Sequence, residues 1–347
     1  MAIDSITDIV GNTPVVRVKT FEKYFPAKIY LKLEFFNPTA SIKDRPAIQI
    51  IRTALSRGDI KPGGTIIEST SGNFGKSLSM LGAALGIKVM VVLDPKASDV
   101  TVRFCKALGA QVVMVDECDE HGSYQTARTR KVQELLAEIP GSFHPDQYQN
   151  PENPKAHEEY TAREILDDFD HLDAYVACIS TGGHFSGVAK VLKKKWPAMS
   201  CIAADAVGSS IITGTHQPYL MNGIGLSWMP DNLSGDQIDK YLQIPCVSSF
   251  ALCRYFARKT GILLGGSSGA ALYAALLESR GKSADYVSLT IAPDSGINYL
   301  DQFYDDHWLK AKNIEKLPDI EELVAEIHQS NFTLMKDGHP VATGSGR

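Results

Sequence analysis

The segment 37–45 places a lysine where an amine could act as a nucleophile. The pair Asn37-Pro38 is typical of a turn, because proline fixes its own φ and disfavours helix at the residue before it. Ser41 is suited to capping a helix that starts next, and Lys43 would then lie in the first turn, near the positive end of the helix dipole. That field and partial burial both lower the pKa of an amine, and such a lysine can form a Schiff base. The plain alternative is that 43–45 is a charged surface turn.

Three further loops, rich in glycine and hydroxyl residues, each follow a predicted strand and precede a predicted helix: 69–75, 180–184 and 265–269. In open α/β sheets, ligands bind at this end of the strands. The loop 180–184 suits a phosphate, because its glycines permit close backbone approach and helix N–H groups follow it. A structural turn is the alternative. The loop matches neither of the common nucleotide-binding glycine patterns, so a nucleotide is not indicated.

The other two loops suit different chemical groups. The loop 69–75 carries small donors at the start of a helix, which fit the α-carboxylate of an amino acid, and Asn73 adds a side-chain amide. In the loop 265–269, the hydroxyls of Ser267 and Ser268 could bond a pyridine nitrogen without protonating it. That difference matters for a cofactor that serves as an electron sink.

Strands and helices alternate along the chain, which predicts an α/β fold with parallel sheets covered by helices. The segment 140–154 is interpreted as a connection between domains, and 206–235 as a long polar loop that covers a site. The tail from about residue 330 is expected to be poorly ordered. The strands are expected at 15–18, 29–34, 65–68, 89–93, 112–115, 174–179, 202–205 and 287–291, and the helices at 43–57, 76–85, 100–108, 124–139, 155–169, 185–196, 249–260 and 270–277.

Composition excludes several classes of function. The net charge of −5 argues against a nucleic-acid partner. We find no signal peptide and no apolar stretch long enough to span a membrane, so we expect a cytoplasmic protein with no membrane partner. The six cysteines are scattered and the histidines share no ligand spacing, so we expect reduced thiols and no metal site.

Several motifs in order along the chain resemble those of fold-type-II pyridoxal 5'-phosphate (PLP) enzymes, specifically the cysteine synthase and cystathionine β-synthase family. The resemblance runs from Gly11 to about Asp301. It implies a tryptophan synthase β-like α/β fold of two open parallel-sheet domains with helices on both faces, and PLP in the cleft between them. The motifs are Gly11-Asn12-Thr13-Pro14, the segment 37–45, Thr70-Ser71-Gly72-Asn73-Phe74-Gly75, Thr181-Gly182-Gly183, Gly223-Ile224-Gly225, Gly265-Gly266-Ser267-Ser268-Gly269 and Pro293-Asp294-Ser295-Gly296.

The resemblance also implies a division of the chain and of its reaction. Residues 1–42 with 150–330 would form a larger cofactor-binding domain, 43–149 a smaller mobile substrate domain, and 331–347 a tail. The family's reaction is β-replacement on an activated L-serine through an α-aminoacrylate. The partners implied are small-molecule amino-acid substrates and a second copy of the chain in a homodimer.

Individual roles follow from the same resemblance. Lys43 would be the catalytic lysine that forms the Schiff base with PLP and moves the α-proton. His184 stands where the family usually has a threonine, so either the backbone contacts the phosphate or the ring serves the second substrate. The remaining residues would be Asn73 at the cofactor's ring oxygen, Ser267 at its pyridine nitrogen, Ser180, Thr181, Gly182, Gly183 and His184 at its phosphate, and Thr70, Ser71 and Asn73 at the substrate carboxylate.

Three segments, 43–47, 119–136 and 299–309, resemble the N-(2-amino-2-carboxyethyl)-L-glutamate synthase branch. That branch joins O-phospho-L-serine and L-glutamate to make a 2,3-diaminopropionate precursor for siderophores and antibiotics. Arg128 matches a basic position of the branch and could meet a phosphate or a second carboxylate, or it could be an exposed helix arginine. Tyr148 matches too and could line the pocket.

Other readings stay open at this point. The segment 150–157 resembles ordinary cysteine synthase, which would combine O-acetyl-L-serine or O-phospho-L-serine with sulfide. A non-catalytic relative that binds a partner or senses a metabolite is a further alternative, although retention of Lys43 argues against it. A dehydratase or racemase of the same fold is another.

Overall fold

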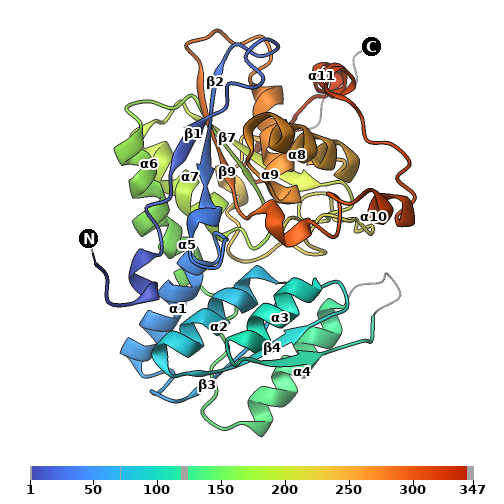
Figure 1. The fold of residues 1–347 in the computed structure, drawn as a ribbon. Helices are drawn as coiled ribbons and strands as arrows, with labels where there is room; N and C mark the ends of the chain where they lie inside the picture. The colour runs from blue at the N-terminus through green and yellow to red at the C-terminus, as the bar shows by residue number, and fades with distance from the viewer. Residues whose placement is uncertain (1, 71, 119–123, 342–347) are drawn as a thin grey trace.

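The structure is a computed structural model that describes residues 2–70, 72–118 and 124–341. The described chain builds one sheet of eight strands and one of three, and each sheet has its own helices. In Figure 1 the larger unit lies above the smaller one, and the chain passes between them near the start of α1 (Asp44–Arg57). This confirms the α/β fold with parallel sheets.

The larger sheet has the order β1-β2-β9-β6-β7-β8-β10-β11. Its five central strands run parallel, and the pairs at its edges are antiparallel. Every residue of β6 is buried, as expected for a strand that is covered on both faces. The strands are β1 Val15–Arg17, β2 Lys28–Leu33, β6 Ala174–Cys178, β7 Ser200–Ala206, β8 Lys240–Ile244, β9 Val287–Ala292, β10 Thr333–Lys336 and β11 His339–Pro340.

Helices cover both faces of this sheet with separate hydrophobic cores. One core includes residues of α8 (Cys246–Thr260), α9 (Gly266–Glu278) and α11 (Ile320–Gln329). The other includes residues of α6 (Ala162–Asp168) and α7 (Gly183–Lys195). Figure 1 shows α6 and α8 on opposite sides of the sheet.

The smaller sheet contains β3 (Thr65–Ser69), β4 (Lys88–Leu93) and β5 (Gln111–Met114), all parallel. One face packs against α1, α2 and α3, and the other against Val132 and Leu135 of α4. The helices are α1 Asp44–Arg57, α2 Asn73–Leu85, α3 Asp99–Ala107 and α4 Gln125–Glu138.

Short elements complete the described chain. They are η1 Ile6–Ile9, η2 Glu34–Phe36, α5 Glu152–Ala156, the π-helical turn η3 His157–Thr161, η4 Gly235–Gln237, η5 Gly296–Tyr299 and α10 Asp306–Ala311. The single helix predicted over 155–169 is therefore interrupted by a π-helical turn.

Two differences from the sequence-based expectation lie at one edge of the larger sheet. The strand β8 was not predicted, because its sequence Lys240-Tyr241-Leu242-Gln243-Ile244 mixes polar and apolar residues. The tail was expected to be poorly ordered, but β10 pairs with β8 and buries Met335. Pairing of an exposed strand edge and burial of an apolar side chain both favour this order. Residues 342–347 lie outside the described part.

The helices that follow the glycine-rich loops begin earlier than expected. The helix α2 starts at Asn73, α7 at Gly183 and α9 at Gly266. Glycine and serine have low helix propensity, so the sequence placed these starts later. The consequence is functional, because the unpaired N–H groups of each first turn then lie inside the loop motif itself.

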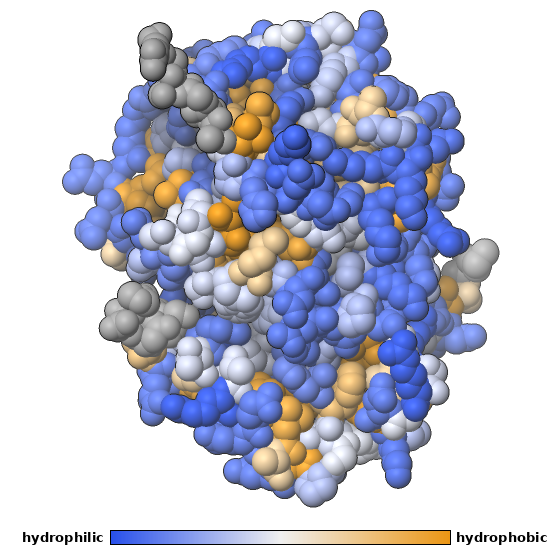
Figure 2. Space-filling model, turned by 180° about the vertical axis from the view of Figure 1, so that it is seen from behind, coloured by the Kyte–Doolittle hydropathy of each residue, from blue (hydrophilic) through white to orange (hydrophobic). Residues whose placement is uncertain are grey.

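Among the described residues, no helix combines the length and the apolar character needed to cross a bilayer. Figure 2 shows that hydrophobic side chains on the rear face form small separate patches among hydrophilic ones.

Candidate active site

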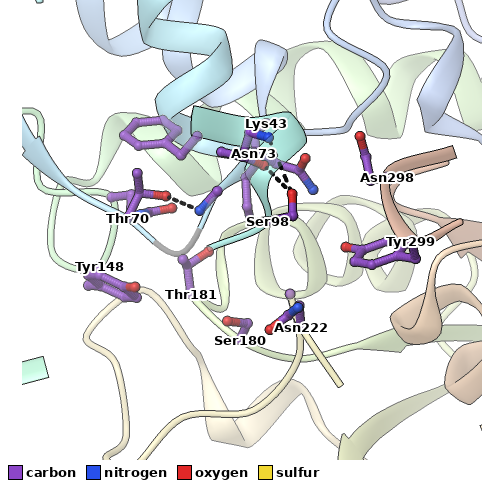
Figure 3. Close-up of a pocket in the computed structure, with 15 residues that line it drawn as sticks. Lys43, Thr70, Asn73, Ser98, Tyr148, Ser180, Thr181, Asn222, Asn298 and Tyr299 are labelled. Carbon is purple, nitrogen blue, oxygen red and sulfur yellow. Dashed lines mark hydrogen bonds between the residues drawn. The ribbon is translucent and has the colours of Figure 1, made fainter. Parts of the chain in front are cut away.

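A cleft lies between the two sheet units, and Lys43 contributes to its wall. In Figure 3, Lys43, Asn73 and Ser98 lie on one side, Ser180 and Asn222 opposite them, Thr70 and Tyr148 at one end, and Asn298 and Tyr299 at the other. The cleft is lined by Lys43, Thr70, Gly72, Asn73, Phe74, Ser98, Thr101, Gln147, Tyr148, Ser180, Thr181, Asn222, Gly223, Asn298 and Tyr299.

Lys43 stands at the N-cap of α1, one position before the first turn in which it was expected. Its backbone N–H donates to Ser41 Oγ at 3.3 Å, so Ser41 holds the turn before the helix. In the described part of the chain no side chain caps α1, so the expectation that Ser41 is the cap was wrong. Ala40 just before it has a φ of +58°, a left-handed conformation that costs energy in a residue with a Cβ.

The amine of Lys43 has no hydrogen bond or ion pair with any residue in the described part of the chain. Removal from water lowers its pKa, while Cys178 and Asp294 act in the opposite direction. A neutral amine that faces a cleft can serve as a nucleophile or as a base. The lowered pKa predicted for Lys43 is therefore matched by its surroundings.

Asn73 connects α2 to the segment that carries Asp294. Its Nδ2 donates to Asp294 Oδ2 at 2.7 Å, and the hydroxyl of Tyr299 donates to the same oxygen at 2.6 Å. Burial raises the pKa of Asp294, and these two donors counter that shift. The carboxylate therefore fixes two residues that line the cleft.

The glycine-rich loop after β6 meets the cleft through Ser180 and Thr181. Gly182 has a φ of +82°, and a Cβ there would lie 2.5 Å from the backbone nitrogen of Leu233. A Cβ at Gly183 would lie 2.0 Å from Asn153 Oδ1, a buried oxygen that has no hydrogen-bond partner among the described residues. The loop therefore accepts no larger residue at either position.

The helix that follows this loop begins without a side-chain cap. Gly182 is the N-cap residue of α7 and, in the described part of the chain, no side chain bonds the first N–H groups of the helix. Such groups together with the helix dipole favour an anion. This matches the predicted phosphate loop.

His184 lies in the first turn of α7 but lines neither the cleft nor the chamber beside it. Its buried ring is 6.0 Å from the ring of His157, and its Nε2 has no partner within the described residues. Burial lowers the pKa of His184 to about 3. The position of the ring disfavours the idea that it serves a second substrate, and leaves contact through the backbone.

The remaining predicted contacts lie at two ends of the cleft. Ser267 is buried in the first turn of α9, and its Oγ would lie 3.9 Å from a Cβ added to Gly223, a lining residue. Thr70 follows β3, and its Oγ1 accepts from the N–H of Gly72 at 3.1 Å. Ser71 lies outside the described residues.

A second chamber of about 140 Å³ adjoins the cleft and shares Tyr148, Ser180, Asn222 and Gly223 with it. The long segment expected to cover a site supplies a large part of its wall. The chamber is lined by Asp94, Lys96, Tyr124, Gln125, Arg128, Tyr148, Ser180, His216, Pro218, Tyr219, Met221, Asn222, Gly223, Ile224, Gly225, Leu226, Ser227 and Trp228.

Arg128 is buried in the wall of this chamber and is not the exposed helix arginine of the alternative interpretation. Its Nη1 lies 3.2 Å from Asp94 Oδ2, and its Nη2 donates to Gln125 Oε1. Within the described residues, Nε and Nη1 have no hydrogen-bond partner. The guanidinium therefore keeps donors for a further anion. Tyr148 packs edge-on against Trp228, with ring centroids 5.2 Å apart.

Sequence reasoning missed part of the lining. Ser98 caps α3 by accepting from the N–H of Thr101 at 3.2 Å, so a serine ahead of an expected helix was the available signal. Asn222 precedes a glycine motif that was recognised. Asn298 lies just beyond the Pro293–Gly296 motif, and no local pattern marks it. Tyr299 begins the segment 299–309, which was noted for its resemblance but not as part of the lining.

Metal chemistry finds no support in the part of the chain that the structure describes, where no group of three or more potential ligand side chains occurs. The cysteines are free thiols, and four of them are buried: Cys105, Cys178, Cys201 and Cys253.

Comparison with known proteins agrees with this geometry. Residues 6–294 match the family described as pyridoxal-phosphate dependent enzyme. The chain is 36% identical to N-(2-amino-2-carboxyethyl)-L-glutamate synthase of Ralstonia nicotianae over 310 residues, which cover 89% of this chain and 92% of that protein. It is also 36% identical to cysteine synthase of Staphylococcus aureus, over 86% of this chain and 96% of that one.

A solved structure supports the same assignment. The hydrogen sulfide-producing enzyme of Fusobacterium nucleatum superimposes with a TM-score of 0.82 at 34% identity, and the match covers 86% of this chain and all of that one. With the lysine, the anion loop and the glycine motifs gathered at one cleft, the chain belongs to the family of pyridoxal-phosphate dependent enzymes.

Proposed function

We propose that this PLP-dependent β-substitution enzyme joins L-glutamate to the β-carbon of O-phospho-L-serine. The bond from the β-carbon to the phosphate oxygen breaks, and a bond from the β-carbon to the amino nitrogen of glutamate forms. The products are N-(2-amino-2-carboxyethyl)-L-glutamate, inorganic phosphate and a proton. The observation that carries the proposal is the chamber that adjoins the cleft of Lys43. The guanidinium of Arg128 lies in the wall of this chamber and has donor atoms without a hydrogen-bond partner among the described residues.

The residues present fit PLP. The uncapped first turn of α7, with Gly182 and Gly183, would hold the phosphate, and Ser180 and Thr181 lie beside it. When bound, PLP supplies an electron sink for negative charge at the α-carbon of an amino acid. Ser267 would accompany the pyridine nitrogen without protonating it, and Asn73 the ring oxygen.

Lys43 would hold the cofactor and move the α-proton of the first substrate. Its amine is suited to both tasks, because it lines the cleft and burial lowers its pKa. The loop of Thr70, Ser71 and Asn73 would bind the substrate carboxylate, since it stands at the start of α2, where N–H groups favour an anion.

The second substrate is inferred from the size and charge of the chamber. A hydrosulfide ion is a single heavy atom and needs no chamber of about 140 Å³. Glutamate carries two carboxylates, and a guanidinium recognises a carboxylate through paired hydrogen bonds. Nε of Arg128 has no hydrogen-bond partner among the described residues, while Nη1 faces Asp94 at 3.2 Å.

Cysteine synthase remains the second candidate, and the resemblance of 150–157 to that enzyme favours it. In the structure, however, Asn153 donates to the carbonyl of Gln147 at 2.7 Å and packs against Gly183 of the phosphate loop. The segment therefore supports the cofactor loop, a task that both enzymes share. It does not discriminate between nucleophiles.

The test is an absorption titration of the PLP-loaded protein. O-phospho-L-serine and O-acetyl-L-serine are added separately, and L-glutamate or sulfide follows. We expect O-phospho-L-serine to change the spectrum, and L-glutamate but not sulfide to restore it with release of the coupled product. Response to O-acetyl-L-serine with recovery by sulfide would establish a cysteine synthase instead. A spectrum that no serine derivative changes would contradict both.

Two further properties belong to the same proposal. We expect the unit formed by 43–149 to move against the rest, because its hydrophobic cores share no residue with those of the larger unit. We also expect a homodimer, since Ile3, Ile6 and Ile9 near the N-terminus are exposed. Light scattering after size exclusion chromatography tests the dimer. We further propose that the product serves siderophore or antibiotic synthesis.

A further inference from the structure

A second lysine lies buried beside the cleft, and none of the predicted roles uses it. Lys76 is only 2% exposed and follows Asn73 by three residues, so the two lie on the same side of α2. Its Nζ donates to Asn298 Oδ1 at 3.1 Å and lies 5.7 Å from the centre of the Phe104 ring. An ammonium has three N–H groups, and burying it with one hydrogen bond is costly. Stability alone does not explain this residue.

The charges around Lys76 belong to the cleft. Burial lowers its pKa, and the carboxylates of Asp294 and Asp44 oppose that shift, with Cys105 contributing least. Asp44 is already bonded by the backbone N–H and the hydroxyl of Thr39. Asp294 is less satisfied, because its Oδ1 has no hydrogen-bond partner among the described residues. Of the two lysines whose charge acts on Asp294, Lys76 has the larger influence and Lys43 the smaller.

Asp294 and Asn298 both support lining residues. Asp294 accepts from Asn73 and Tyr299, and Asn298 lines the cleft itself while its Oδ1 accepts from Lys76. Acceptance at Oδ1 fixes which way the amide of Asn298 is turned. The ammonium of Lys76 thus acts on both Asp294 and Asn298. Figure 3 shows Asn298 and Tyr299 side by side at one end of the cleft.

We propose that Lys76 is a positioning residue, whose ammonium keeps Asp294 ionised and Asn298 oriented and thereby holds Asn73 and Tyr299 at the wall of the cleft. The inference rests on the proposed use of this cleft for PLP and the serine substrate. It does not depend on which second substrate follows.

The pH dependence follows from the groups that face Asp294. Removal of the ammonium raises the pKa of Asp294, so its carboxylate becomes protonated at a higher pH and accepts less well from Asn73. The acid limit of the site then moves upward. The groups that act on Asp294 are Tyr299, Asn73, Lys76 and Lys43, and Cys178, Cys253 and Tyr304 also feel its charge.

The experiment compares Lys76→Met, Lys76→Gln and Lys76→Arg with the parent chain and with Lys106→Met, an exposed lysine on α3. Two quantities are measured between pH 5 and pH 9. One is the Kd of PLP for the apo protein, and the other is kcat/KM for phosphate release from O-phospho-L-serine without a second substrate. Thermal unfolding is measured in parallel.

We expect the acid limb of both profiles to move up by about one pH unit in Lys76→Met and Lys76→Gln, which corresponds to a tenfold loss on the limb. Lys76→Arg and Lys106→Met should keep the parent limb. Lys76→Gln retains a donor for Asn298, so it decides the matter if Lys76→Met does not fold.

The inference would be overturned if the acid limb of both pH profiles is unchanged in Lys76→Gln and only the Tm or the plateau of the profile is lower. Lys76 would then be a structural residue. A limb that moves equally in Lys76→Arg would overturn it as well. If the parent chain itself neither binds PLP nor releases phosphate, the proposed function fails instead, and the two failures are thus told apart.

Discussion

Lys43 and Arg45 lie two residues apart at the start of one helix, yet the protein treats their charges in opposite ways. Arg45 is buried and makes paired contacts with two carboxylates, at 2.6 Å from Nε to Glu34 Oε2 and 2.6 Å from Nη1 to Glu164 Oε1. Lys43 faces the cleft, and its amine has no partner in the described part of the chain. The difference separates a charge that holds the fold from an amine kept for chemistry.

The pKa values follow the same division. Burial alone would lower the pKa of Arg45, but Glu34 and Glu164 outweigh it and raise the value. At Lys43 burial prevails and the pKa is lowered. A buried ion pair costs desolvation, which Arg45 recovers through its bidentate geometry. At Lys43 no carboxylate pairs with the amine in the described part of the chain, so burial decides the direction of the shift.

The largest effect is expected from Lys43→Ala. Activity should fall by at least about a thousandfold, because nucleophile and base are lost together. The free energy of unfolding should change by less than about 1 kcal/mol, since no partner is left unpaired. Steady-state kinetics and urea denaturation measure the two quantities. A variant that unfolds readily would show that Lys43 also holds the fold, and the contrast with Arg45 would be lost.

Arg45→Met should produce the reverse pattern. It leaves Glu34 and Glu164 without their partner, and breaking a buried pair in this way costs about 3–5 kcal/mol. Urea denaturation should show this loss. Arg52→Met, which removes an exposed arginine from the same helix, should change stability little and serves as control. Equal stability of the two variants would contradict the structural role of the network.

Arg128→Gln tests a charge that lies between the cases of Arg45 and Lys43. Arg128 makes one ion pair, with Asp94, and also has donor atoms without a hydrogen-bond partner among the described residues. Hydrogen bonds to a charged group contribute about 1.5–3 kcal/mol, so KM for L-glutamate should rise about tenfold to a hundredfold. Phosphate release from O-phospho-L-serine alone should be unchanged. Arg130→Gln, on the same helix and exposed, is the matched control. An unchanged KM would remove Arg128 from the second substrate.

The smallest effect concerns pH. Burial would raise the pKa of Glu164, but Arg45 and then Lys32 lower it to about 2 from an ordinary value of 4.5. A depressed carboxyl pKa gives stability that is present above the ordinary value and is lost as the pH falls toward the lowered one. The stability difference between the parent chain and Glu164→Gln should therefore be constant above about pH 5 and shrink between pH 4.5 and pH 2. A stability difference that stays constant over the whole pH range would contradict the predicted loss of stability at low pH.

The sequence could predict the parts of the site that lie in local motifs. Glycine loops that follow buried strands carry their own signal, and Asn73 and Thr181 from two of these loops line the same cleft as Lys43. The α/β alternation likewise predicted both sheets, because parallel strands buried on two faces form continuous apolar runs.

Other parts depend on contacts between distant segments and left no local signal. Lys76 looks like an ordinary helix lysine until Asn298, 222 residues away, is seen to accept from it. The strand β10 pairs with β8, and β8 itself was missed. Tertiary packing, which overrides local propensity, decides these features.

The measurement that tests the central claim most directly is chemical trapping. The PLP-loaded protein is reduced with borohydride, digested, and mapped by mass spectrometry. The account predicts a phosphopyridoxyl group on the peptide that contains Lys43 and none on the peptide that contains Lys76. Modification at Lys76, or at neither lysine, would contradict the assignment of Lys43 as the amine reserved for chemistry.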